Sequence, residues 1–214
     1  MILAALLAMV VCFCLKDQLF AVVLYPKPDY LQLINVDIAQ QFLIHMRVAL
    51  LSGLIIVAPY FVYEIFSFVA PGLYATERRM TSKAIICACL LFYLGVALNY
   101  FVVFPFAVNF LGSYQVNDDV KNLISLTSYV DLLVVMSFVM GLFFELPVLC
   151  WLLAKFGLLK AAVMRRYRRH AIVAIIILGA IITPTGDPFT LAVVAVPIYL
   201  LWELSIMIVK QVEQ

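Results

Sequence analysis

The residues best suited to chemistry in this sequence are isolated carboxylates, and the first is Glu77, which is followed directly by Arg78 and Arg79. It stands in a short charged connector, residues 68–79 (FVAPGLYATERR), between two long apolar runs. A carboxylate and a guanidinium form two parallel charge-assisted hydrogen bonds, a geometry that lysine cannot copy. Glu77 is therefore either neutralised by its arginine neighbours or held ready for a cationic guest, and the residues alone leave both alternatives open.

Glu145 is a carboxylate of a different kind, because it interrupts an apolar run. It lies ten residues before Lys155, about 15 Å along a helix, and so near the middle of a hydrocarbon core of about 30 Å. A charge at that depth costs roughly 2.5 to 3.5 kcal/mol on insertion scales, so the carboxyl group must be protonated, paired or hydrated. Pro147 also frees the carbonyl of Phe143 nearby. The segment predicts either a hydrogen-bonded packing residue or an intramembrane polar site, Glu145 with Pro147, that faces a cavity or a partner helix.

The composition sets the class of protein that must position these carboxylates. Of the 214 residues, 67% are hydrophobic and 12% are charged, and the mean hydropathy is +1.14. A soluble domain carries about 25% charged residues, so we expect a multi-pass membrane protein, one all-α domain over residues 1–214. The five cysteines lie in apolar runs, which disfavours a disulfide framework. His45 and His170 should lie near opposite membrane faces, and no catalytic or metal motif stands out. We expect no enzyme, no cofactor, no metal and no nucleic-acid partner.

Six transmembrane helices are predicted. The first covers residues 1–15, which reach only about 22 Å and which residues 18–25 should continue outward. A secretory signal peptide is disfavoured, because the basic start and the small-residue cleavage site are missing. The second covers residues 42–70, with a kink at Pro59 and with Glu64, which either pairs near the membrane face or faces a functional cavity.

The third and fourth helices are predicted at residues 84–104 and 131–154. Pro105 should end the third helix, so that residues 106–114 turn along the far surface or form a short second helix.

The last two helices, residues 171–182 and 189–209, are predicted to be short. Residues 171–182 give only about 18 Å of helix before the chain reverses. Such a helix requires extension by the preceding basic segment, a thinner bilayer, or an outer end below the membrane surface.

The basic residues orient the chain. Six Lys and Arg residues and no acidic residue lie between positions 155 and 170, which the positive-inside rule places in the cytoplasm. The Glu77 connector, two crossings earlier, must lie on the same side, and ten of the 14 Lys and Arg residues then fall there. The cluster is explained either by topology and anchoring to anionic lipids or by a dedicated partner site.

Five motifs follow one another along essentially the whole chain. They are FVAPGLYxxERR at 68–79, YFVVFP at 100–105, FELP at 144–147, RRYRR at 165–169, and TPxxDPF at 183–189 with VPIY after it. Together they resemble the TatC family, the multispanning core of the twin-arginine protein translocase. The resemblance implies a concave cup of six helices in the bacterial inner membrane, with both termini in the cytoplasm.

The resemblance also implies the function. The protein would bind signal peptides bearing paired arginines and assemble with TatA and TatB single-span partners, and with further copies of itself, to export folded proteins with the proton-motive force. Glu77 would receive a signal-peptide arginine, and Glu145 would line the cup. The surface implied for signal-peptide binding consists of Glu77, Phe68, Pro71, Leu73, Tyr74, Arg78 and Arg79. The partner-helix contact implied by the last hairpin consists of Thr183, Pro184, Asp187, Thr190 and Leu191. Because Arg78 and Arg79 would repel a cationic guest, we expect them to anchor on phosphates or internal acids.

Two departures from the family pattern and one alternative accompany this interpretation. The acidic N-terminal segment that shares arginine recognition is absent, so we expect a truncated or misassigned start, weaker peptide binding and loss of export. Leu191 stands where relatives often have glutamine. The alternative is a proton-coupled transporter of small molecules or ions, in which Glu145 relays protons with Glu64 and Glu203; uptake of a radiolabelled solute would favour it.

The charge distribution generates a topology prediction. Single cysteines at positions 77 and 160 should react with a membrane-impermeant thiol reagent only from the cytoplasmic side, and cysteines at 118 and 186 only from outside. Labelling of position 160 from outside would overturn the six-span arrangement.

Overall fold

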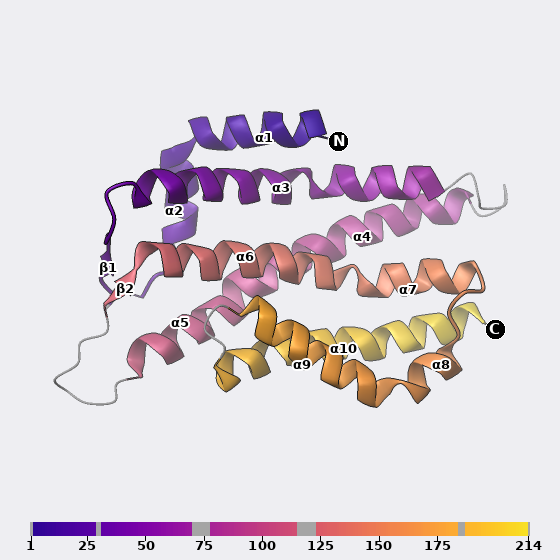
Figure 1. The fold of residues 1–214 in the computed structure, drawn as a ribbon. Coiled ribbons are helices and arrows are strands. Elements are labelled where there is room, and N and C mark those ends of the chain that lie inside the picture. The colour runs from indigo at the N-terminus through magenta and orange to yellow at the C-terminus, as the bar shows by residue number, and fades with distance from the viewer. Residues whose placement is uncertain (1, 29–30, 70–77, 115–122, 184–186, 214) are drawn as a thin grey trace.

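The computed structural model describes residues 2–28, 31–69, 78–114, 123–183 and 187–213, and shows an elongated bundle of helices (Figure 1). Four helical stretches are long and apolar enough to cross a membrane, and a fifth is reached if the bent pair Leu3–Cys14 and Lys16–Leu24 counts as one span. The four are Gln40–Ile65, Ala84–Ser113, Leu126–Lys155 and Pro188–Val212. The described helices therefore confirm the multi-pass, mostly helical class and account for four to five of the six predicted spans.

The helices are α1 (Ile2–Cys14), α2 (Lys16–Leu24), α3 (Gln40–Val69), α4 (Arg78–Leu98), the π-helical turn η3 (Asn99–Val103), α5 (Phe104–Ser113), α6 (Leu126–Phe144), α7 (Leu146–Lys155), α8 (Ala161–Arg166), α9 (Arg168–Ile182) and α10 (Pro188–Val212). The stretch formed by α6 and α7 is the central one, because 56% of its apolar window is buried, against 22% to 33% in the other three. The main core includes Val48, Phe104, Met136 and Ile198, all completely buried.

The N-terminal helix does not run straight. α1 and α2 meet at 84°, so residues 18–25 do not continue the first helix in a straight line. The ring of His45 in α3 stacks on Phe13 with centroids 4.2 Å apart, and its Nε2 lies 3.1 Å from the Phe13 carbonyl oxygen. His45 thus offers a partner to a carbonyl at the end of α1, next to the bend. The exposed charges of Lys16 and Asp17 stay at the surface there.

The third span continues through Pro105, which is a correction of the break predicted at that residue. Residues 84–113 form one helical stretch of 30 residues, in which the π-helical turn η3 ends at Val103, two residues before Pro105. The N–H of Phe104 donates to the carbonyl of Asn99, five residues back. Pro105 then occupies the first turn of α5, where a proline ring fits without clash. The helix therefore continues past Pro105, with its hydrogen-bonding pattern changed locally to that of a π-helical turn.

The last hairpin agrees with the prediction in its first helix and corrects it in the second. α9 begins at Arg168, so the basic segment extends it to 15 residues, about 22 Å. Figure 1 shows that the end of α9 and the start of α10 stop short of the end of the bundle where α5 ends. α10 is not short, because its 25 residues begin at Pro188 and continue through Pro197. A hydrogen bond from the N–H of Thr190 to Asp187 Oδ2 (2.7 Å) caps its start.

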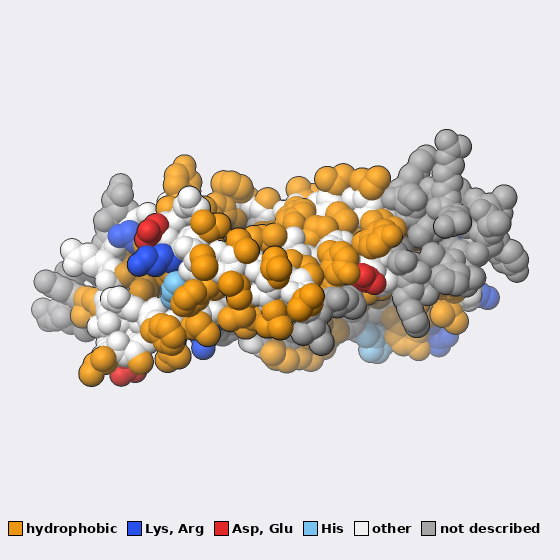
Figure 2. Space-filling model, turned by 90° about the horizontal axis from the view of Figure 1, so that it is seen from above, with side chains coloured by type: hydrophobic (Ala, Val, Ile, Leu, Met, Phe, Trp, Pro, Cys, Tyr) orange, Lys and Arg blue, Asp and Glu red, His pale blue; other side chains and the backbone are white. Residues whose placement is uncertain are grey.

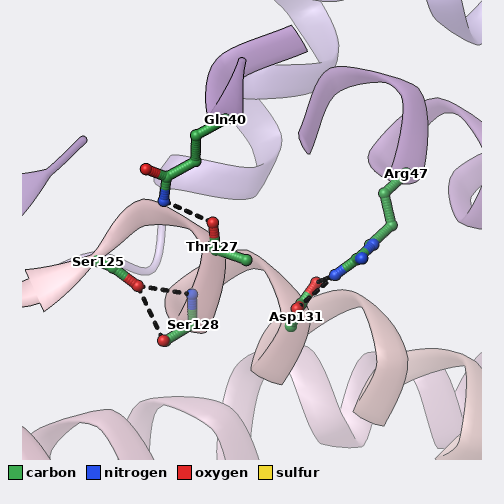
Figure 3. Close-up of polar contacts among 6 residues, drawn as sticks. All are labelled: Gln40, Arg47, Ser125, Thr127, Ser128 and Asp131. Carbon is green, nitrogen blue, oxygen red and sulfur yellow. Dashed lines mark hydrogen bonds and ion pairs between the residues drawn. The ribbon is translucent and has the colours of Figure 1, made fainter. Parts of the chain in front are cut away.

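A polar cluster joins the loops at the end of the bundle opposite to the C-terminus. Two short strands, β1 (Leu33–Ile34) and β2 (Ile124–Ser125), pair in parallel and are an exception to the all-α prediction. Gln40 accepts the N–H groups of Val36 and Asp37 and donates to Thr127 Oγ1. Arg47 of α3 donates hydrogen bonds to both carboxylate oxygens of Asp131 in α6 (Figure 3). These bonds fix the start of α6 against α3.

The surface seen over α1 and α3 is mainly apolar (Figure 2). Hydrophobic side chains cover its middle, and basic and acidic groups gather near one end. Large side chains of α1, such as Leu3, Leu7 and Val10, are more than 60% exposed. An apolar surface of this extent is expected of helices that face lipid or partner helices.

The contact between α1 and α3 generates a stability prediction. A Cβ atom on Gly53 would lie 2.9 Å from the backbone nitrogen of Met9, and backbone cannot move aside as a flexible side chain can. We expect Gly53→Ala to lower the free energy of unfolding by about 1 to 3 kcal/mol through overpacking, measured as thermal denaturation in detergent. Ser52→Ala, at the neighbouring half-buried position, is the control and should unfold like the wild type. Equal midpoints for all three proteins would show that α1 does not pack as described.

Candidate functional site

Glu145 lies at the junction of the two helices that form the central span. α6 ends at Phe144, the N–H of Glu145 donates to the Leu142 carbonyl at 3.1 Å, and α7 begins at Leu146. Glu145 thus sits at a break in the helix, where backbone and side chain are both polar. Pro147 in the first turn of α7 lacks the N–H that would continue the helix regularly.

The carboxyl group of Glu145 faces an otherwise apolar cavity of about 460 Å³, which we call the Glu145 hollow. Its walls come from α3, α4, α6 and α7, and include Leu54, Phe61, Phe92, Phe138 and Leu149. Glu145 Oε1 is buried and has no hydrogen-bond partner among the described residues. A buried acceptor without a partner costs about 1 to 3 kcal/mol, so folding alone does not explain this residue.

Pro147 lines a different cavity, although it is only two residues away. This second cavity, the α7–α10 groove, measures about 600 Å³ and lies between α4, α7, α10 and the end of α6. Pro147 and Trp151 of α7 line it together with Leu94 and Leu204. The structure therefore does not bring Glu145 and Pro147 into one polar site: Glu145 supplies the polar atom of the hollow, and Pro147 contributes to an apolar groove.

Close packing of α4 against α6 separates the two cavities. A Cβ on Gly95 of α4 would lie 2.8 Å from the ring of Phe144, and a Cβ on Gly141 of α6 would lie 2.7 Å from the ring of Phe92. Each glycine thus packs against an aromatic ring of the opposite helix. In the sequence, each glycine lies inside an apolar run and three residues from a phenylalanine: Phe92 precedes Gly95, and Phe144 follows Gly141. Each of these phenylalanines contacts the glycine of the other pair. This reciprocal contact was not predicted.

Four of the five predicted partner-contact residues belong to the described part of the chain, which ends at Thr183 and resumes at Asp187. Thr183 Oγ1 donates to the Gly179 carbonyl at 2.9 Å, and Asp187 caps α10. Thr190 is completely buried, and its Oγ1 has no hydrogen-bond partner among the described residues. Leu191 approaches α9 closely, since a Cβ on Gly179 would lie 2.7 Å from Leu191 Cδ1. Among the described residues of the hairpin, the hydroxyl of Thr190 at the start of α10 is therefore unpaired; Pro184 lies outside the described residues.

The predicted signal-peptide surface falls largely on the connector between α3 and α4. Glu77, Pro71, Leu73 and Tyr74 lie outside the described residues. Phe68 belongs to the last turn of α3, and Arg78 and Arg79 open α4. The end of α3 and the start of α4, which flank this connector in the sequence, lie at the same end of the bundle as the end of α7 and the C-terminus (Figure 1).

The sequence analysis missed one buried polar pair. Asn99, in the π-helical turn, is completely buried and donates from Nδ2 to Ser137 Oγ at 2.9 Å. Ser137 in turn donates to the Leu133 carbonyl within α6. An asparagine within a long uncharged run was the available signal. The pair joins η3 to the central helix.

One member of the relay required by the transporter alternative, Glu203, is bound elsewhere. Glu203 of α10 binds Arg168 of α9 and accepts from the Tyr199 hydroxyl at 3.0 Å. It thus faces α9, whereas Glu145 faces the cavity bordered by α3 and α4. Among the described residues, no three His, Cys, Asp or Glu side chains come together as a metal site.

The fold and the site define a class first: a multi-pass helical membrane protein with a single carboxylate in an apolar cavity. Residues 1–197 match the family described as Sec-independent protein translocase protein (TatC). The chain is 35% identical to the protein of that name from Deinococcus radiodurans, covering 94% of this chain and 76% of the relative. It is 34% identical to that of Koribacter versatilis, covering 82% of this chain and 64% of the relative.

Solved structures agree with these sequence comparisons. A crystal structure of the twin arginine translocase receptor TatC matches with a TM-score of 0.86 and 28% identity, over 100% of this chain and 94% of that chain. The same receptor in the detergent DDM matches with a TM-score of 0.87 and 29% identity, over 96% of this chain and 92% of that chain. The chain belongs to the TatC family, whose members are components of a protein translocase and not enzymes.

The unpaired carboxyl group generates a prediction that separates stability from function. Glu145→Leu removes a buried acceptor without a partner and should raise the free energy of unfolding by about 1 to 3 kcal/mol, measured as thermal denaturation in detergent. If the hollow must stay polar for transport, Glu145→Gln should keep more export of a twin-arginine reporter than Glu145→Leu does. Phe138→Leu, which alters the same wall without a polar atom, is the control. Full export by Glu145→Leu would reduce the residue to packing.

Proposed function

We propose that this protein is the core receptor subunit of a twin-arginine export system, which binds twin-arginine signal peptides and assembles with TatA-like and TatB-like single-span partners. Membership of the TatC family and the match to a translocase receptor over the whole chain support this role. The observation that carries it within this chain is Glu145, whose buried Oε1 has no hydrogen-bond partner in the described part of the chain and which lines an apolar hollow between four helices. Such a group is expensive to keep inside a membrane and indicates a site used by a guest.

The proposed division of labour follows from where the polar groups lie. Glu77 would read a signal-peptide guanidinium at the connector, where a pair about 4 Å apart gains up to about 4 kcal/mol at an effective dielectric near 20, before desolvation and ordering costs. The apolar segment of the signal peptide would then enter the Glu145 hollow. Thr190, with its unpaired hydroxyl at the start of α10, would offer a hydrogen bond to a partner helix.

The proposed orientation places both termini, the Glu77 connector and the basic segment in the cytoplasm of a bacterial cell. Figure 1 supports it, because the ends of α3 and α7, the helix α8 and the C-terminus all lie at one end of the bundle. The residues between positions 155 and 170 hold six of the 14 Lys and Arg residues. This end therefore satisfies the positive-inside rule. Export of the folded cargo would be driven by the proton-motive force.

The connector generates the sharpest test of peptide recognition. Glu77→Ala should weaken binding of a twin-arginine signal peptide by roughly 10- to 150-fold, which corresponds to the loss of a charge-assisted pair of about 1.5 to 3 kcal/mol. Glu77→Lys should weaken it further. The measurement is crosslinking from a photoreactive twin-arginine signal peptide to the protein, or binding of such a peptide to the purified protein. Glu213→Lys, an equal change of charge at the same end of the bundle, is the control. Unaltered crosslinking in Glu77→Lys at normal protein levels would refute this role.

A further inference from the structure

The wall of the Glu145 hollow has one polar member, and this member is an acid. Among the described residues that line the hollow, all except Glu145 are aliphatic or phenylalanine. The buried Oε1 of Glu145 has no hydrogen-bond partner in the described part of the chain. No lysine or arginine of this wall neutralises the carboxyl group. A group that pairs with Glu145 in the hollow must therefore belong to a ligand.

The hollow has the size and the access of a small-molecule site. Its volume of about 460 Å³ falls within the range of about 300 to 1,000 Å³ that is usual for sites of small ligands. Ile65 of α3, Leu142 of α6 and Leu149 of α7 line it and are nevertheless 46% to 50% exposed. The rim of the hollow thus lies at the apolar surface of the bundle. A ligand dissolved in the bilayer can reach it there without passing through water.

The chemistry of the wall favours an amine over a neutral ligand. Hydrogen bonds between ionised groups are roughly twice as strong as those between neutral groups. An amine that enters from the lipid as the free base can take the proton of the Glu145 carboxyl group. Ammonium and carboxylate then form together, and no net charge enters the membrane. An alcohol of the same shape gains only a neutral hydrogen bond.

Aromatic side chains add to this preference for a cation. Phe61, Phe92 and Phe138 line the hollow from three different helices, α3, α4 and α6. The face of an aromatic ring attracts an ammonium group, and the attraction increases where water is excluded. One carboxyl group within a wall that contains three phenylalanines therefore matches an ammonium group attached to a compact apolar body.

We propose that the Glu145 hollow binds membrane-soluble primary amines, with the ammonium group on the Glu145 carboxylate and the apolar body of the ligand between α3, α4, α6 and α7. The carboxylate supplies the specificity, and the apolar wall supplies the contact area. In the proposed function the same hollow takes the signal peptide, so a bound amine would compete with that peptide. This consequence rests on the proposed function, whereas the amine site itself rests on the cavity and its carboxyl group.

Binding of 4-phenylbutylamine and of 4-phenylbutanol to the purified full chain tests the proposal. The two probes share their apolar body and differ in the amino or hydroxyl group at its end. The wild-type protein in nonionic detergent should bind the amine about ten-fold more tightly than the alcohol. The measurement is isothermal titration calorimetry, corrected for partitioning of each probe into empty micelles.

Matched variants identify the group that causes the preference. Glu145→Gln keeps the shape of the side chain without its charge, so it should weaken binding of the amine by about ten-fold and remove the preference over the alcohol. Glu64→Gln, the same change in α3 but outside the wall of the hollow, should keep the preference. Ala58→Leu should fill part of the hollow and weaken binding of both probes while the carboxyl group stays in place.

Three results would each overturn the proposal: equal affinities of the wild-type protein for the two probes, an unchanged preference in Glu145→Gln, or binding of the amine that Ala58→Leu leaves unaffected. The assay contains no signal peptide, so such a failure leaves the receptor role untouched. In the same way, unaltered signal-peptide crosslinking in Glu77→Lys would refute the receptor role and leave the amine site standing.

Discussion

A polar group inside an apolar bundle must find a partner within the protein or meet water, and this constraint explains most of the structure. His45 lies within hydrogen-bonding distance of the carbonyl of Phe13 beside a bend of 84°. Asn99 binds Ser137 beside a π-helical turn, and Glu203 binds Arg168 between the last two helices. Each pair stands where a helix is bent or irregular, or where two helices must be held together.

Some buried polar atoms have no hydrogen-bond partner among the described residues, and two of them are informative for that reason. Glu145 Oε1 and Thr190 Oγ1 have no hydrogen-bond partner among the described residues. Both lie at the start of a helix that carries a proline in its first turn, α7 and α10. We interpret them as the unused hydrogen-bonding groups of the receptor, one for the signal peptide in the hollow and the other for a partner helix. In the proposed function these groups would be used when the complex assembles, and this use would account for their cost.

The sequence predicted the class of fold well, because twenty-residue apolar runs and clustered cations are strong signals. The prominence of Glu145 was also predictable, since its depth follows from counting residues back from Lys155. Local irregularities of the helices were not predictable. Pro105 was expected to end a helix, but a π-helical turn before it allows the helical stretch to continue. The separation of Glu145 from Pro147 depends on which side of α4 each residue faces, and no one-dimensional pattern contains that information.

In the proposed function, the signal peptide enters the Glu145 hollow and not the α7–α10 groove. Photoreactive residues placed at Leu142, in the hollow, and at Leu204, in the α7–α10 groove, test this assignment directly. In membranes containing a twin-arginine precursor, position 142 should crosslink to the signal peptide only when both arginines of that peptide are present, and position 204 should not. Equal crosslinking from both positions, or crosslinking from position 204 alone, would contradict the assignment.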